Sequence, residues 1–71
     1  MPPLPILTAK QVVKGLERNG FALTRQKGSH ATFRHDDGRI AVVPMHSGDL
    51  KRGTLRSILR QAALDADDFT S

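Results

Sequence analysis

A chain of 71 residues without a single cysteine has to be held together by one small hydrophobic core. It is too short for two domains and has no means of forming disulfide bonds. A polypeptide of this size buries only roughly 60% of its unfolded surface on folding. We therefore expect a single domain with a shallow surface site rather than a large internal cavity. The absence of cysteine also excludes cysteine-based metal sites and fits a reducing compartment.

The charges are unevenly distributed along the chain. Eleven lysines and arginines face seven acidic residues, and residues 1–60 carry all eleven bases but only four of the acids. A basic body of this kind favours a polyanionic partner, most simply a nucleic acid. The start, MPPLPILTA, has neither the basic residues nor the long apolar run of a signal peptide or membrane span. We therefore expect a soluble, cytoplasmic protein that does not bind membranes.

The first part of the chain predicts a leader followed by a helix. Prolines favour an extended course for residues 1–7. Thr8 and Gln11 have the spacing of a capping box, and Gly20 has the position of a residue that ends a helix. The pattern predicts a helix from Ala9 to Asn19. Its inward-facing residues are expected to be Val12, Val13 and Leu16.

Three short runs of β type follow, at Phe21–Gln26, His30–His35 and Arg39–Val43. The letters DDG between the last two are a hairpin signal. Alternation predicts one apolar face made of Phe21, Leu23, Ala31, Phe33, Ile40 and Val42. His30, Thr32 and Arg34 fall on the opposite face, so we expect the side chain of His30 to point away from the core.

An apolar stripe of Leu55, Ile58, Leu59 and Ala62 predicts a second helix over Thr54–Ala63. Arg56 and Arg60 lie on its flank, in line with Arg52 if the helix begins early. Together with Lys51, these arginines form a basic stripe. It is equally compatible with contact to a phosphate near the positive end of the helix and with plain solvation. The order of elements predicts an α+β domain: a three-stranded antiparallel sheet with two helices on one face.

Other site classes find little support in the sequence. His35 stands beside the hairpin turn, where an ordinary structural histidine is the expected interpretation. The three histidines and the acidic pair of Asp36 and Asp37 lack the ligand spacing of a zinc site. The stretch GDLKRGT does not match a phosphate-binding loop. We therefore expect neither a metal nor a cofactor.

The stretch GFALTRQKGSHATFRHDDGRIAVVPMHSGDLKRGTLRSILRQAAL resembles the HicA, or YcfA-like, toxin family of bacterial toxin–antitoxin pairs. The matching parts are RQKGSH, the aromatic Phe33, Pro44 with His46, and GTLRSILRQA, in family order over residues 9–66. The resemblance implies a double-stranded-RNA-binding-like fold over residues 8–71. It also implies an mRNA interferase, the toxin of a type II system, that cleaves mRNA without the ribosome. Its expected partners are RNA and a HicB-like antitoxin, with oligomers formed only through the antitoxin.

The resemblance also assigns roles to individual residues. The family's catalytic histidine follows Gly-Ser, which corresponds to His30. Ala31 stands where relatives often carry a bulky or aromatic residue, and we expect this difference to affect substrate stacking. The RNA-binding residues that we expect are Lys27, Gly28, Ser29, Arg34, His46, Lys51, Arg52 and Arg56.

This chemistry is plausible for a site with one histidine. RNA carries its own nucleophile, the 2′-hydroxyl, so the enzyme has only to move protons and neutralise charge, and an imidazole exchanges protons near neutral pH. Lys27 can neutralise the phosphate, and the second acid–base group is His46, Lys27 or water. The alternative is a non-catalytic module that binds double-stranded RNA through the basic helix. The two hypotheses differ at His30: with alanine there, a pure binding module would lose little affinity, whereas a ribonuclease would keep binding RNA and lose cleavage.

Overall fold

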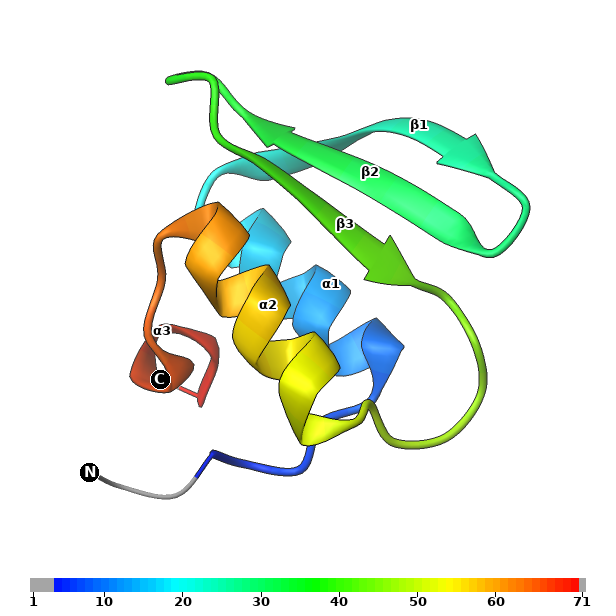
Figure 1. Ribbon diagram of the computed structural model, residues 1–71. Coiled ribbons are helices and arrows are strands. Elements are labelled where there is room, and N and C mark those ends of the chain that lie inside the picture. Colours follow the sequence, from blue (N-terminus) through cyan, green and yellow to red (C-terminus); the bar gives the residue numbers. More distant parts are fainter. Residues whose placement is uncertain (1–3, 71) are drawn as a thin grey trace.

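The structure, a computed structural model, describes residues 4–70, so the predicted course of residues 1–3 lies outside it. Three strands form one antiparallel sheet in the order β1-β2-β3, and α1 and α2 cover the same face of it (Figure 1). The elements are α1 (Ala9–Arg18), β1 (Phe21–Lys27), β2 (His30–His35), β3 (Ile40–Pro44), α2 (Arg52–Ala62) and α3 (Ala66–Thr70). The predicted α+β fold is confirmed. Within residues 4–70, no helix is long and apolar enough to span a membrane.

The capping box at the start of α1 is present as predicted. The hydroxyl of Thr8 accepts a hydrogen bond from the N–H of Gln11 at 3.2 Å, and Oε1 of Gln11 accepts one from the N–H of Thr8 at 2.9 Å. Each of these two backbone N–H groups at the start of the helix thereby has a side-chain oxygen as its acceptor. The helix ends at Arg18, and α2 begins at Arg52, two positions before its predicted start.

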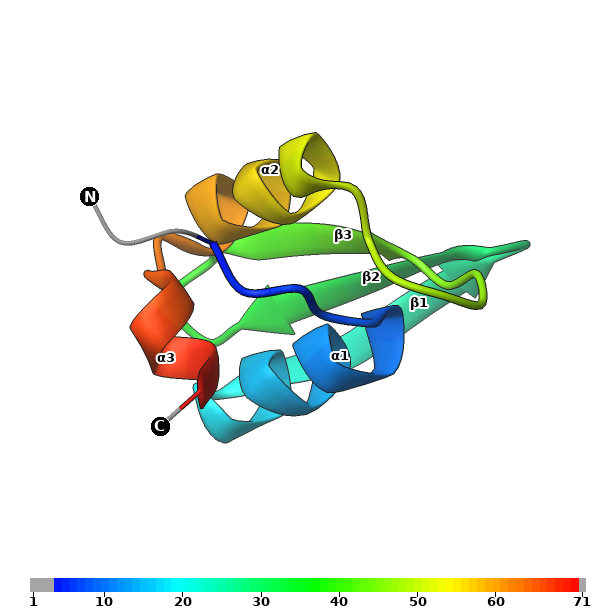
Figure 2. The same cartoon turned by 90° about the horizontal axis from the view of Figure 1, so that it is seen from below.

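The predicted apolar face is right for β2 and wrong for β3. Ala41 and Val43 are fully buried, whereas Ile40 is 49% exposed and Val42 only half-buried. The register explains the difference, because Phe33 pairs with Ala41 and directly paired residues point to the same face. Leu23 pairs with Phe33 and therefore faces the helices, but it lies on the edge strand β1 and is 52% exposed. The turn at the far end of the β1–β2 hairpin extends past both helices (Figure 2).

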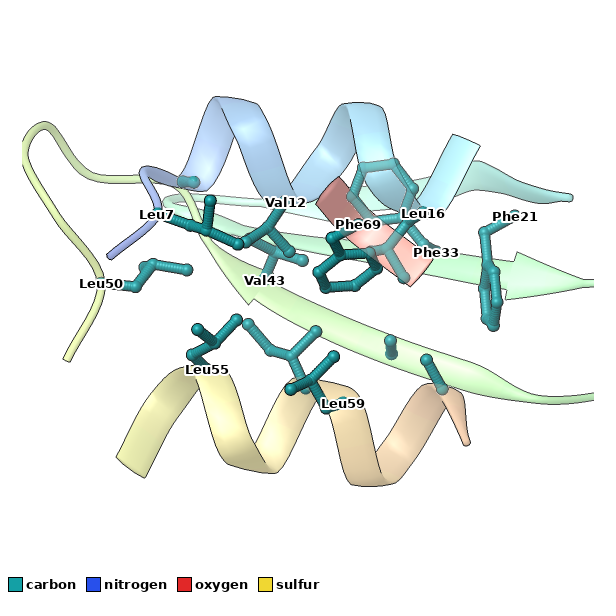
Figure 3. Packing of buried hydrophobic residues seen from close by; sticks show 14 of the residues in the cluster. Leu7, Val12, Leu16, Phe21, Phe33, Val43, Leu50, Leu55, Leu59 and Phe69 are labelled. Atoms are coloured by element: carbon teal, nitrogen blue, oxygen red, sulfur yellow. The ribbon is translucent and has the colours of Figure 1, made fainter. Parts of the chain in front are cut away.

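The core lies between the sheet and the two helices (Figure 3). Its largest fully buried side chains are Leu16, Leu55, Ile58, Val12 and Val43. The predicted stripe of α2 is confirmed, since all four of its members are buried. A bond from the N–H of Val42 to Oε1 of Gln61, 3.0 Å long, also ties the edge of β3 to α2. Of the two faces of the sheet, the helices thus cover one and leave the other free for contacts with other molecules.

The leader residues that the structure describes are held against the domain. Leu7 is buried in the core, and its carbonyl accepts a hydrogen bond of 2.8 Å from the N–H of Leu50. Leu4 packs partly against the same core, and this segment runs between α1 and α2 (Figure 2). The division into a leader of residues 1–7 and a domain of residues 8–71 stays a prediction.

The short helix α3 is fastened to the end of α1. The side chain of Phe69 is buried against Gly15, and the carbonyl of Phe69 accepts a hydrogen bond from the guanidinium of Arg18. The amide of Asn19 donates to the carbonyl of Asp68 at 3.1 Å. A Cβ at position 15 would lie 2.5 Å from Cδ1 of Phe69, which leaves no room for a side chain there.

We therefore expect Gly15→Ala to destabilise the protein even though alanine is the better helix former. Helix propensity favours alanine by about 1 kcal/mol, but displacing a buried phenylalanine costs about 1.5–3 kcal/mol. The net loss in the free energy of unfolding should be about 0.5–2 kcal/mol, measured by urea denaturation. Gly53→Ala is the matched control, because a Cβ there meets nothing within 4 Å. An equal response of the two variants would contradict this account of α3.

Candidate active site

His30 lies opposite Lys27 across the tight turn that joins β1 to β2. The two residues are directly paired in the sheet, and Gly28 and Ser29 form the turn between them. Gly28 has a φ of +58°, in keeping with the glycine preferred at the first central position of a type II′ turn. Directly paired residues have Cα atoms about 4.5–5.5 Å apart and side chains on one face. The turn therefore sets the side chains of Lys27 and His30 side by side.

A β-bulge in β1 decides which face Lys27 occupies. Leu23 pairs with Phe33, but the next pair is Arg25 with Thr32, so Thr24 is an extra residue without a partner. The hydroxyl of Thr24 donates to the carbonyl of Thr32 at 3.2 Å. Because each residue of a strand alternates in direction, an extra residue reverses the faces that follow it. Arg25 and Lys27 are thereby turned to the face of the sheet that the helices leave uncovered.

His46 reaches the same end of the sheet through the segment after β3. Pro44 pairs with His30, and the N–H of Met45 donates to the carbonyl of Ser29, which extends the ladder past the end of the strand. His46 follows directly, and its N–H donates to the carbonyl of Pro44 at 3.1 Å. Its side chain is exposed, with Nδ1 3.3 Å from the carbonyl oxygen of Ser47. His30 and His46 thus belong to one neighbourhood of the fold.

The other basic residues of the predicted site lie apart from His30. Arg34 is exposed on the same face but four residues along β2, which is roughly 13 Å at the rise of a strand. Lys51, Arg52 and Arg56 are exposed at the start of α2, and this helix packs on the opposite face of the sheet (Figure 1). The structure therefore divides the predicted residues into a sheet group around His30 and a helix group on α2.

His35 has the structural role that was expected for it. Its Nδ1 accepts a hydrogen bond of 3.1 Å from the N–H of Asp37, and its ring meets Phe21 edge to face, with centroids 5.3 Å apart. In the same turn, hydrogen bonds from the side chain of Arg39 and then from its N–H hold the pKa of Asp37 below its ordinary value. These contacts shape the β2–β3 turn at the end of β2 remote from His30.

A comparison with known protein families identifies the family of this chain. The family model of the HicA toxin of bacterial toxin–antitoxin pairs matches residues 9–64, which include the whole sheet and α2. The chain belongs to the HicA toxin family. As a HicA family member it is the toxin of a toxin–antitoxin pair and has an antitoxin as its partner. A search of curated proteins finds no significant match.

One expectation about this HicA family toxin is wrong. Ala31 was expected to affect substrate stacking, but its side chain is buried and faces the helices. It pairs with Val43 inside the core, so the residue type at position 31 acts on packing and not on a bound base. Among residues 4–70, no group of three or more histidine, cysteine or acidic side chains lies close enough together to hold a metal ion.

Arg25 is an exposed basic residue of this face that the sequence-based prediction did not include. Strict alternation from Phe21 would place it toward the helices, and only the bulge at Thr24 brings it to the face of His30. No glycine or other sequence signal marks this bulge. In this HicA family toxin, the face that Arg25 occupies follows from the pairing of β1 with β2.

Proposed function

We propose that this HicA family toxin is a metal-independent endoribonuclease that cleaves mRNA without the ribosome, with His30 as its acid–base group. The observation that supports this most is the pairing of an exposed imidazole with Lys27 across a two-residue turn. The imidazole can move a proton, and the ammonium group can neutralise a phosphate. Both groups are exposed and accessible to a large substrate.

The reaction that fits these groups uses the 2′-hydroxyl of the RNA as nucleophile. His30 takes the proton of this hydroxyl, the 2′ oxygen forms a bond to phosphorus, and the bond to the 5′ oxygen breaks. The leaving oxygen receives a proton from His46, Lys27 or water. The products are a 2′,3′-cyclic phosphate and a 5′-hydroxyl. Lys27 and the N–H groups of Gly28 and Ser29 stabilise the charge that develops on the phosphate.

Residues farther from His30 serve to hold the substrate. Arg34 binds a phosphate on the sheet face, and the exposed Lys51, Arg52 and Arg56 add contacts from the start of α2. The exposed basic stripe of α2 is also the observation in favour of the alternative, a module that binds double-stranded RNA without cleaving it. Cleavage by the purified protein distinguishes the two functions.

The antitoxin that we propose is a HicB-like protein with an acidic surface. It covers the basic face around His30, because an acidic partner matches this face in charge and excludes the RNA by occupying it. The toxin then forms oligomers only through the antitoxin complex. Cleavage takes place in the cytoplasm, where mRNA and antitoxin are both present.

The experiment that tests the proposal is an RNA cleavage assay without ribosomes. We expect the purified toxin to cleave a labelled RNA oligonucleotide and the antitoxin encoded beside its gene to stop the reaction at a 1:1 ratio. Hydroxyl-radical or cross-linking footprints should show Lys27, His30 and Arg34 protected in the complex. Tight RNA binding without cleavage would favour the alternative function. A complex that leaves these residues accessible and cleavage unimpeded would rule out occlusion.

A further inference from the structure

The free face of the sheet is organised in three rows, each with one residue from every strand. The rows follow from the register, since paired residues share a face. They are Lys27, His30 and Pro44, then Arg25, Thr32 and Val42, then Ala22, Arg34 and Ile40. Successive rows are two residues apart on β2, which is about 6.7 Å. Every row therefore holds at least one basic residue.

These basic side chains are available for a ligand. The three rows contain Lys27, His30, Arg25 and Arg34 and no acidic residue. Within residues 4–70, none of the four forms an ion pair, whereas Arg39 is bound to Asp37. The four are also exposed to solvent. A positive face of this size without internal partners fits an extended polyanion.

The third member of each row is apolar. Pro44 and Val42 are half-buried, and Ile40 is 49% exposed although it lies on the free face. The face is thus divided lengthwise into a basic track on β1 and β2 and an apolar strip on β3. An acidic protein would need only the charges, but a single-stranded nucleic acid offers phosphates and exposed base faces side by side. A duplex, in contrast, hides the faces of its bases.

We propose that single-stranded RNA lies along this face, with its backbone on the track that runs from Lys27 and His30 past Arg25 to Arg34. The step between rows is comparable with the spacing of phosphates in an extended strand. The bases lie against Ile40 and Val42. This inference rests on the proposed function, because it places the scissile phosphate at His30. It adds Arg25 as a positioning residue that holds the neighbouring phosphate.

The bulge at Thr24 has a clear role under this proposal. If Thr24 were paired regularly with Thr32 instead of forming a bulge, Arg25 and Lys27 would point toward the helices, and the track would keep only His30 and Arg34. The bulge therefore completes the middle of the track and sets Lys27 beside His30 at the same time. It lies in the exposed edge strand, where one unpaired residue is tolerated without disturbing the core.

The test measures binding of a non-cleavable strand, an eight-nucleotide 2′-O-methyl RNA, by fluorescence anisotropy at several salt concentrations. We expect Arg25→Gln and Arg34→Gln each to weaken binding about fivefold and to lower the salt slope by about 0.7, the value for one lost phosphate contact with a single strand. Ile40→Ser should weaken binding about threefold without changing the slope, because it removes an apolar contact. Lys14→Gln, at an exposed position on α1, is the matched control and should bind like the unmodified toxin.

Further measurements distinguish binding of a single strand on this face from other modes of RNA binding. With a cleavable strand, Arg25→Gln should raise KM about fivefold and leave kcat nearly unchanged, as a positioning residue requires. Reversing the charges of Lys51, Arg52 and Arg56 should weaken duplex binding more than single-strand binding. Circular dichroism and thermal melting confirm that each variant is folded.

Three results would overturn the proposal. The first is that Arg25→Gln and Arg34→Gln bind the single strand with the same affinity as Lys14→Gln. Another is tighter binding of a duplex than of a single strand of the same length. The third is a loss confined to antitoxin binding, which would make the face a protein surface. Because the bound strand is not cleaved, these results are independent of whether the toxin is a ribonuclease.

Discussion

Replacing His30 with alanine is expected to abolish growth arrest in cells that express the toxin without its antitoxin. The imidazole is exposed on the free face of the sheet, so its loss removes proton transfer and no part of the core. General acid–base catalysis is worth roughly 10²- to 10⁴-fold, and cleavage of RNA should fall by that factor. The measurements are the growth of the expressing strain and the cleavage rate of the purified variant.

The matched control is His35→Ala, which removes a histidine from the other end of the same strand. His35 is packed against Phe21 and bonded to the N–H of Asp37, so this variant should lose stability and keep its cleavage rate per folded molecule. His30→Ala should show the reverse: an unchanged melting temperature and no toxicity. Undiminished toxicity of a folded His30→Ala protein would refute the assignment of His30.

A single 2′-deoxy sugar at the cleavage site should stop cleavage there completely, because the proposed nucleophile is then missing. Cleavage of the unmodified strand should continue in excess EDTA, since a reaction that uses the 2′-hydroxyl needs no metal ion to activate water. The mapped ends should be a 5′-hydroxyl and a 2′,3′-cyclic phosphate or its hydrolysed form. End-labelled oligonucleotides, incubated with and without chelator, provide all three measurements.

The position of the deoxy sugar supplies the internal control for this experiment. A deoxy sugar several nucleotides away should leave the cleavage rate unchanged, which separates loss of the nucleophile from a general loss of affinity. Cleavage at the substituted sugar, or a strict need for a divalent ion, would exclude the proposed mechanism. It would leave open a ribonuclease that uses water as its nucleophile.

Much of the fold is predictable from local sequence signals. The capping box of Thr8 and Gln11 marks the start of α1, and the apolar stripe of α2 is buried as its spacing predicts. The DDG sequence lies in the turn between β2 and β3, where the N–H of His35 donates to the carbonyl of Arg39. Each of these signals works within a few residues of the chain, and so it can be read without knowing the tertiary structure.

The errors concern properties that depend on pairing between strands. In the run IAVVP nearly every residue is apolar, so alternation cannot say whether Ile40 and Val42 or Ala41 and Val43 face the core. The turn over residues 36–39 decides it, because it sets the register in which Phe33 pairs with Ala41. The bulge at Thr24 and the contact between Gly15 and Phe69 are likewise invisible locally, because both depend on residues that are distant in the sequence.

The candidate site was predicted in part. The GSH tripeptide led to His30, and the structure adds the pairing with Lys27 and the proximity of the segment that carries His46. It also shows that the basic residues of α2 belong to another layer of the domain. Arg25 was missed because the face that it occupies depends on register, which the sequence does not state. Ala31 was placed correctly on the apolar face by alternation, and the stacking role expected for it came from the family resemblance alone.

The separation of a packed face from a free face has a consequence for how such a toxin gene evolves. None of the exposed basic residues of the free face belongs to the buried core, so selection for survival can inactivate the toxin by single substitutions there without producing an unfolded protein. A toxin that loses a single side chain of this face but keeps the rest of its antitoxin-binding surface would still occupy its antitoxin. Harmless copies of the gene would then act on their active relatives by competing for the same antitoxin, and their influence on the cell would outlast their own activity.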